Sequence, residues 1–232
     1  MELWTSIGNQ TFVLCTKGKY IEGLCLHYRV TEGEANYTGA VRIQPAADRA
    51  ESERITMLRG TAEILPSVGM FLMHGAVVAT NGFAYMFTAP SGTGKTTRAN
   101  LWLEEFPGSY ILNGDKPFVR PEEKSVFVCG TPWSGKEEME RNEVLPLRAV
   151  YMVERNDDGE ETLIKKLRPN EAFIRLYGQQ VHWPKDPDMK KETIRLLEST
   201  VKQVPVYRFR SRPTREAIRL AHDVALGRAS GQ

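Results

Sequence analysis

The chain is poor in cysteine, in net charge and in long apolar runs, and each shortage excludes a class of protein. Its 232 residues include three widely spaced cysteines, Cys15, Cys25 and Cys129, an odd number without zinc-type spacing that indicates reduced thiols. Lys and Arg (31) nearly balance Asp and Glu (29), which argues against a general nucleic-acid or membrane-surface binder. No stretch approaches the ~20 apolar residues of a membrane span, and no signal peptide is evident. We therefore expect a soluble, cytoplasmic protein whose partners include neither nucleic acid nor membrane.

The pattern of apolar runs predicts two parts of unequal size. Short β-type runs at 12–15, 24–28 and 40–43, separated by turn residues, predict a small β-rich N-terminal element over residues 1–60. This element carries no recognisable chemistry. Residues 61–232 are expected to form the main domain, which is long enough to bury a sizeable core.

The main domain alternates strand-like and helix-like segments and is predicted to be an α/β unit with a mixed sheet. Two apolar runs, 70–79 and 83–88, are joined by Asn81-Gly82, a strong hairpin signal. A tight hairpin turn at 156–159 is expected between strands at 147–154 and 162–167, and it accounts for Asp157 and Asp158 without a metal site. Further strands are expected at 110–112, 125–129 and 204–209, and helices at 53–65, 170–180, 189–203 and 214–227.

The segment 89–97, Ala-Pro-Ser-Gly-Thr-Gly-Lys-Thr-Thr, lies between a predicted strand and a predicted helix and has the form of a phosphate-binding loop. Its glycines let backbone N–H groups converge on phosphate oxygens, its lysine adds a charge for the outer phosphates, and its first threonine offers a hydroxyl to Mg²⁺. Ala89 stands where the pattern usually has Gly. The residues expected to bind a nucleoside triphosphate are Ser91, Gly92, Thr93, Gly94, Lys95, Thr96 and Thr97.

Three further residues are candidates for chemistry at the outer phosphate, each with a plainer alternative. Asp115 follows the strand at 110–112, where a carboxylate can reach Mg²⁺ or an attacking hydroxyl, although it is also a turn residue in Asn-Gly-Asp. Lys136 closes a second small-residue loop that could be an ordinary exposed turn. His74 lies among apolar residues, where a histidine is more often a hydrogen-bonded core residue.

Together these segments resemble the HPr kinase/phosphorylase family. The resemblance rests on His74-Gly75 before the loop, the loop itself, the Asn-Gly-Asp-Lys-Pro segment at 113–117 and the Gly-Thr-Pro-Trp-Ser-Gly-Lys segment at 130–136. It implies a P-loop domain of the phosphoenolpyruvate-carboxykinase type, with His74 and Asp115 in the active site and Lys136 at the phosphate or acceptor. It also implies ATP and Mg²⁺ as cofactors, Thr96 and Asp115 as metal ligands, and a homo-oligomer.

The departures from the family leave two functions open. Relatives carry two adjacent aspartates where this chain has Gly114-Asp115, and the segment tied to dephosphorylation is absent. The leading expectation is an ATP- and Mg²⁺-dependent kinase that phosphorylates a hydroxyl of a peptide, protein or small molecule. The alternative is a nucleotide-binding switch or scaffold without transfer activity. Arg208, Arg210 and Arg212 could attract an acidic acceptor, or form a solvated sheet face.

Overall fold

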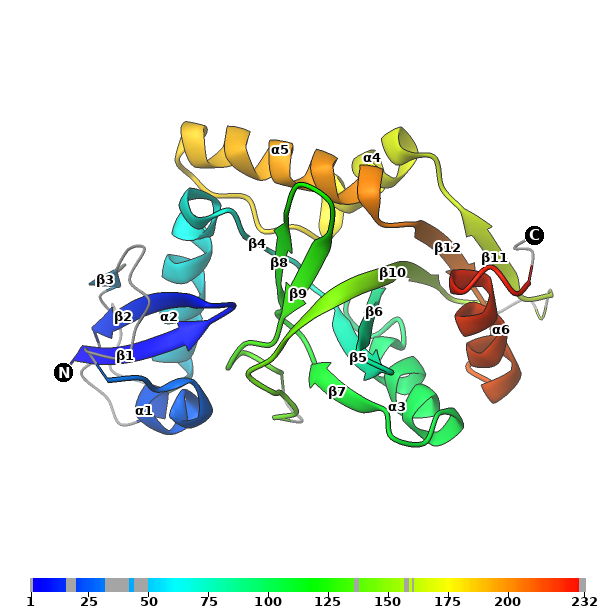
Figure 1. Cartoon of the computed structure of the whole chain (residues 1–232), viewed down its shortest axis with the longest axis horizontal. Coiled ribbons are helices and arrows are strands. Elements are labelled where there is room, and N and C mark those ends of the chain that lie inside the picture. The colour runs from blue at the N-terminus through cyan, green and yellow to red at the C-terminus, as the bar shows by residue number, and fades with distance from the viewer. Residues whose placement is uncertain are drawn as a thin grey trace.

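A nine-stranded mixed sheet lies between helices, and a three-stranded sheet lies beside it at the N-terminal side (Figure 1). The computed structural model describes residues 2–15, 20–31, 42–43, 50–135, 138–156, 159 and 161–229. Within these residues, no helix combines the length and the apolar character needed to cross a membrane. The α/β class and the mixed strand directions agree with the expectation from the sequence.

The large sheet has the order β4-β8-β9-β10-β6-β5-β7, with β12 beside β10 and β11 at the outside. Strand β10 pairs antiparallel with β9 through its first residues and parallel with β6 and β12 through its later ones. It therefore joins the two halves of the sheet. The strands are β4 (Phe71–Leu72), β5 (Ala76–Thr80), β6 (Phe83–Thr88), β7 (Tyr110–Asn113), β8 (Phe118–Pro121), β9 (Val126–Cys129), β10 (Val144–Glu154), β11 (Leu163–Lys166) and β12 (Val206–Arg210).

Each face of this sheet buries its own core. Side chains of β5 alternate between the two cores, with Val77 in one and Ala76 and Val78 in the other, as a pleated strand requires. The first core is closed by α4 (Pro169–Gln179) and α5 (Pro187–Gln203), and the second by α3 (Lys95–Glu105) and α6 (Arg215–Ala225). Because both faces are covered, every residue of β5 is buried, which explains its continuous apolar run.

The N-terminal element packs through a third core. It contains β1 (Glu2–Ile7), β2 (Gln10–Cys15), α1 (Tyr20–Leu24), the short 3₁₀ helix Leu26–Tyr28, β3 (Arg42–Ile43) and α2 (Ala50–Ile64), and a second 3₁₀ helix, Leu65–Val68, follows it. This core combines Ile21, Met57 and residues of the main domain such as Phe118 and Trp133. The strand expected at 24–28 is wrong, because these residues end α1 and form the 3₁₀ helix. Of the run expected at 40–43, only residues 42–43 lie within the described part.

The two hairpins expected in the main domain have different outcomes. Asn81 and Gly82 have φ of 51° and 77°, the left-handed pair of a two-residue turn, and β5 and β6 pair antiparallel across them. The second hairpin is wrong, because β12 lies between β10 and β11 and pairs with both. The expected pairing joined β10 to β11 because the two strands are neighbours in the sequence. In the structure β10 pairs with β12, which comes much later in the chain. Asp157 and Asp158 lie outside the described residues.

Candidate active site

The sheet brings three separate segments to one edge. Strand β5 lies between β6 and β7 and is antiparallel to both, so β6 and β7 run in the same direction. Their carboxyl ends therefore meet the beginning of β5. The phosphate-loop segment follows β6, Asp115 follows β7, and His74 precedes β5, which places all three at this edge.

The loop after β6 has the backbone geometry expected of an anion cradle. Gly92 and Gly94 have φ of 76° and 98°, and α3 begins at Lys95. Among the described residues no side chain caps this helix at Gly94, which leaves the N–H groups of its first turn for an anion. The Lys95 ammonium lies 2.9 Å from the carbonyl oxygen of Ala89 and 3.2 Å from that of Pro90. The lysine ammonium is thus held within the loop, where its positive charge would attract phosphate oxygens.

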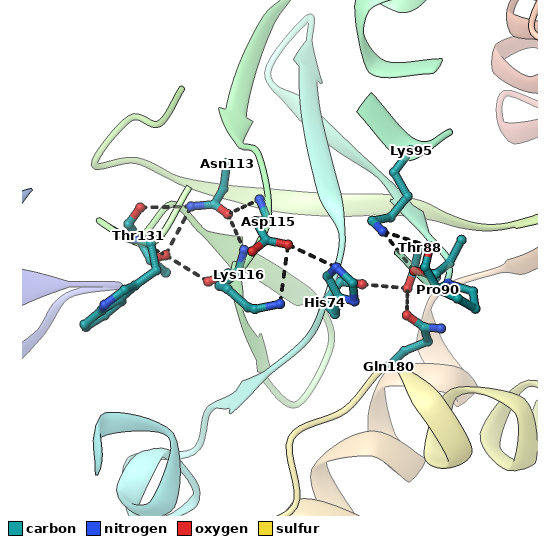
Figure 2. Close-up of polar contacts among 11 residues, drawn as sticks. His74, Thr88, Pro90, Lys95, Asn113, Asp115, Lys116, Thr131 and Gln180 are labelled. Atoms are coloured by element: carbon teal, nitrogen blue, oxygen red, sulfur yellow. Dashed lines mark hydrogen bonds and ion pairs between the residues drawn. The ribbon is translucent and has the colours of Figure 1, made fainter. Parts of the chain in front are cut away.

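His74 and Asp115 form a direct pair beside the loop (Figure 2). The Nε2 atom of His74 lies 3.0 Å from Oδ1 of Asp115, and the ammonium of Lys116 lies 3.3 Å from the same oxygen. In this arrangement His74 donates an N–H to the carboxylate. Among the described residues both polar contacts of the Asp115 carboxylate use Oδ1, which leaves Oδ2 for a metal ion or a hydroxyl group.

A network around Asn113 fixes the backbone that carries Asp115. The Asn113 side-chain oxygen accepts hydrogen bonds from the backbone N–H groups of Asp115 (3.0 Å) and Lys116 (2.8 Å). Its amide group donates to the carbonyl of Thr131 at 2.9 Å, and the Thr131 hydroxyl donates to the carbonyl of Lys116 at 2.8 Å. Asp115 is therefore part of an Asn-Gly-Asp turn, as the plainer alternative expected. The turn also fixes the position of its carboxylate, so the two interpretations are compatible. It also ties the 113–117 segment to the 130–135 loop.

The backbone of His74 is held from the opposite side. Its N–H donates to the carbonyl of Gln180 at 2.8 Å, and its carbonyl accepts a hydrogen bond from the Thr88 hydroxyl at 2.7 Å. The same hydroxyl lies 2.8 Å from the side-chain oxygen of Gln180. Thr88 is the last residue of β6, so the histidine is linked directly to the strand that carries the loop.

The electrostatics favour a charged carboxylate in the pair. Burial alone raises the pKa of Asp115, but the hydrogen bond from His74 and the charge of Lys116 outweigh it, so the pKa lies below its usual value. Burial lowers the pKa of Lys95, and the nearby Asp115 charge partly offsets this effect. Asp115 is therefore an ionised acceptor of hydrogen bonds at neutral pH.

Gly114 marks a close approach between two backbone segments. A Cβ atom at this position would lie 2.3 Å from the carbonyl oxygen of Ser134, far inside van der Waals contact. An aspartate would therefore require the 130–135 loop to move. In the present position of this loop, the Ser134 carbonyl occupies the space that a side chain at position 114 would need.

These residues line one cavity of about 790 Å³, within the usual range for small-molecule sites. Its phosphate side, as we call it, consists of His74, Asp115 and the loop residues Ser91, Gly92, Gly94, Lys95, Thr96 and Thr97. Its N-terminal side consists of Tyr20, Leu24 and Arg54. Gly114, Pro132, Ser134, Gly135 and Glu138 complete the lining. Sequence reasoning missed the N-terminal side entirely, because no motif marks single residues in α1 and α2.

Other candidates from the sequence have different outcomes. Thr93 lines a smaller cavity of about 200 Å³ on the loop, together with Arg155 and Arg212. Arg208 pairs with Glu154 at 2.7 Å, and none of the three alternating arginines lines the large cavity. Lys136 lies outside the described residues.

The donor atoms fit Mg²⁺ bound together with a nucleotide. Thr96 supplies a hydroxyl and Asp115 a carboxylate in the same cavity, and Mg²⁺ is commonly held by one or two protein oxygens together with phosphates and water. In the described part of the chain, no cluster of three or more His, Cys, Asp and Glu side chains is placed to hold a metal ion. A metal site here would therefore depend on the phosphates.

Comparisons with known proteins add little. No protein-family model matches the chain, and no curated protein matches it. Among solved structures, the Hpr(Ser) kinase/phosphatase from Coxiella burnetii is similar with a TM-score of 0.31 and 10% identity, covering 54% of this chain and 93% of that one. A likeness at this score shows neither a common fold nor a common activity.

Proposed function

We propose that the protein is an ATP- and Mg²⁺-dependent kinase of the HPr-kinase-like type, which transfers the γ-phosphoryl group to a hydroxyl of a peptide, protein or small molecule. The observation that carries this proposal is that the His74–Asp115 pair lines the same cavity as Lys95 and Thr96. Phosphoryl transfer requires a phosphate cradle and a group that positions the attacking oxygen, and catalysis is mostly positioning and charge stabilisation. The cavity has a candidate for each, because the loop with Lys95 suits phosphates and Asp115 suits a hydroxyl group.

Each residue has a distinct role in this proposal. The loop amides and Lys95 bind the phosphates, and Thr96 and Asp115 would hold Mg²⁺, which would supply positive charge for the phosphate oxygens. The Oδ2 atom of Asp115 accepts a hydrogen bond from the acceptor hydroxyl and orients it. His74 fixes the carboxylate through Oδ1, and together with Lys116 it keeps the pKa of Asp115 low.

Gly114 favours a second candidate, a nucleotide-binding switch or scaffold without transfer activity. Only one of the paired carboxylates of the resembled family is present, and the Ser134 carbonyl occupies the space that a side chain at position 114 would need. In this case Asp115 would serve Mg²⁺ binding alone, and the nucleotide would control a partner instead of reacting.

One assay separates the two candidates. The wild type, Lys95→Ala and Asp115→Asn are incubated with γ-labelled ATP, Mg²⁺ and hydroxyl compounds, and nucleotide affinity is measured in parallel. A kinase labels an acceptor, and either substitution abolishes the labelling. A switch protein binds nucleotide, loses binding with Lys95→Ala and labels nothing in any form.

A further inference from the structure

The N-terminal side of the cavity consists of groups that suit an organic acceptor. This side is lined by Arg54 of α2, whose side chain carries a guanidinium, and by Tyr20 and Leu24 of α1, whose side chains are aromatic and aliphatic. Tyr20 is 40% exposed, which is high for an aromatic side chain in a folded protein. A cavity wall with one cation and two apolar groups resembles a site for a small molecule or a short peptide segment.

This wall is fixed to the site and does not lie against it loosely. Ile21 of α1, Met57 of α2 and Trp133 are each 0% exposed and belong to the same core. The indole N–H of Trp133 donates to the backbone carbonyl of Arg54 at 3.2 Å. Trp133 is adjacent to Ser134, whose carbonyl lies against Gly114. A continuous chain of contacts therefore places Arg54 relative to Asp115.

The N–H donors of the cavity have different partners. Lys95 lies within the phosphate loop, 2.9 Å from the carbonyl oxygen of Ala89, and His74 is engaged by Asp115. Arg54 belongs to neither group. A guanidinium binds carboxylate and phosphate oxygens through paired N–H donors, and the loop already provides for the phosphates of the donor.

We infer that the acceptor carries a carboxylate beside its hydroxyl group, that Arg54 binds this carboxylate, and that Tyr20 and Leu24 contact the apolar part of the acceptor. This inference rests on the proposed kinase activity and extends it to the substrate class. Two sources present the same chemistry: the carboxylate of a free hydroxy amino acid, and an acidic side chain next to a serine in a peptide. Arg54 is then a specificity-determining residue, and an acceptor lacking the negative charge is disfavoured.

The test compares two pairs of probes with Mg-ATP as donor. L-serine is compared with L-serinamide, and a serine peptide flanked by Glu with the same peptide flanked by Gln. The proteins are the wild type, Arg54→Ala, Arg54→Lys and the control Arg59→Ala, which changes an exposed arginine of the same helix that does not line the cavity. Transfer gives kcat/KM, and Mg-ATP affinity is measured separately.

We expect the wild type to prefer the carboxylate member of at least one pair by about tenfold or more, and the pair that shows it identifies the source. Arg54→Ala should reduce this preference below about threefold with unchanged Mg-ATP affinity, and Arg54→Lys should retain part of it because the charge remains without the planar fork. Arg59→Ala should behave as the wild type.

Three results would overturn the inference. Equal transfer by the wild type to the acid and amide members of both pairs would be consistent with the kinase proposal and would contradict recognition of an acceptor carboxylate. An equal loss on all probes with Arg54→Ala would mean that Arg54 acts on the transferred phosphate. Mg-ATP binding without transfer to any of the four probes would overturn the inference, and the kinase proposal would fall with it only if no other hydroxyl compound is labelled either.

Discussion

The two sides of the cavity differ in origin and in how they are held. The phosphate side comes from residues 74–115 at one sheet edge, and hydrogen bonds around Asn113, Thr88 and Gln180 fix it. The N-terminal side comes from two helices far from the loop in sequence, held by an apolar core and one hydrogen bond from Trp133. Under the proposed function, donor binding belongs to the sheet edge and acceptor choice to the N-terminal element.

The largest expected effect concerns the contact between Gly114 and Ser134, where the two sides meet. Gly114→Ala places a Cβ 2.3 Å from a backbone carbonyl and should lower the free energy of unfolding by about 3 kcal/mol. Gly178→Ala in α4 is the matched control, because no atom lies within 4 Å of its Cβ. It should stabilise the protein by up to about 1 kcal/mol. Urea denaturation measures both, and equal effects would contradict the proposed close approach.

A smaller effect tests the hydrogen bond that joins α2 to the site. Trp133→Phe removes the donor to the Arg54 carbonyl and should cost about 1–3 kcal/mol, with faster amide exchange in α2. It should also weaken the carboxylate preference without changing Mg-ATP affinity. Trp183→Phe removes a comparable indole donor, to the Tyr177 carbonyl at 2.9 Å, outside the cavity lining. A loss of acceptor preference in the Trp183 variant as well would contradict the assignment.

The smallest expected effect is the pH dependence of stability that comes from His222, a buried residue that does not line the cavity. Burial among Tyr85, Trp102 and Phe106 lowers the pKa of His222 below its usual 6.5, and the charges of Arg228 and Arg148 add to this against that of Asp223. At pH values near and below 6.5 the unfolded chain therefore binds more protons at His222 than the folded protein does. The stability that the neutral His222 contributes is fully present above pH 6.5 and is lost as the pH decreases below it.

The variant His222→Phe isolates this contribution. Its free energy of unfolding should fall less steeply than that of the wild type between about pH 6.5 and 5. Asp115 stays ionised over this range because its pKa lies below its usual value. The transfer rate per folded molecule should therefore not fall through protonation of this carboxylate. Identical slopes for the two proteins would contradict the role given to His222.

The sequence predicts the phosphate side much better than the N-terminal side, for physical reasons. Strand β6, its loop and α3 form a local unit, and Asn81-Gly82 determines the neighbouring strand through the φ values that this turn requires. His74 and Asp115 were candidates from local motifs. Their 3.0 Å contact depends on β5 lying between β6 and β7, which no local pattern encodes.

Tertiary packing decided the rest. The sequence predicts that β11 pairs with β10, because the two strands are adjacent in the chain. In the sheet, β12 lies between β10 and β11 and pairs with both. The run at 24–28 looks strand-like, but Cys25 and Tyr28 are buried in the core shared with Trp133, and the segment is helical. Arg54 reaches the cavity only because this core places α2 beside the 130–135 loop.

Phosphoryl transfer at the sheet edge is tested most directly by measuring nucleotide affinity and transfer rate separately in Asp115→Asn. With Mg-ATP and an acceptor labelled by the wild type, this variant should transfer about 100-fold more slowly or worse, while its affinity for ATP measured without Mg²⁺ stays within about threefold of the wild-type value. Lys95→Ala should lose the affinity itself. Transfer by Asp115→Asn at the wild-type rate, or a wild type that binds Mg-ATP and labels no acceptor, would contradict the account.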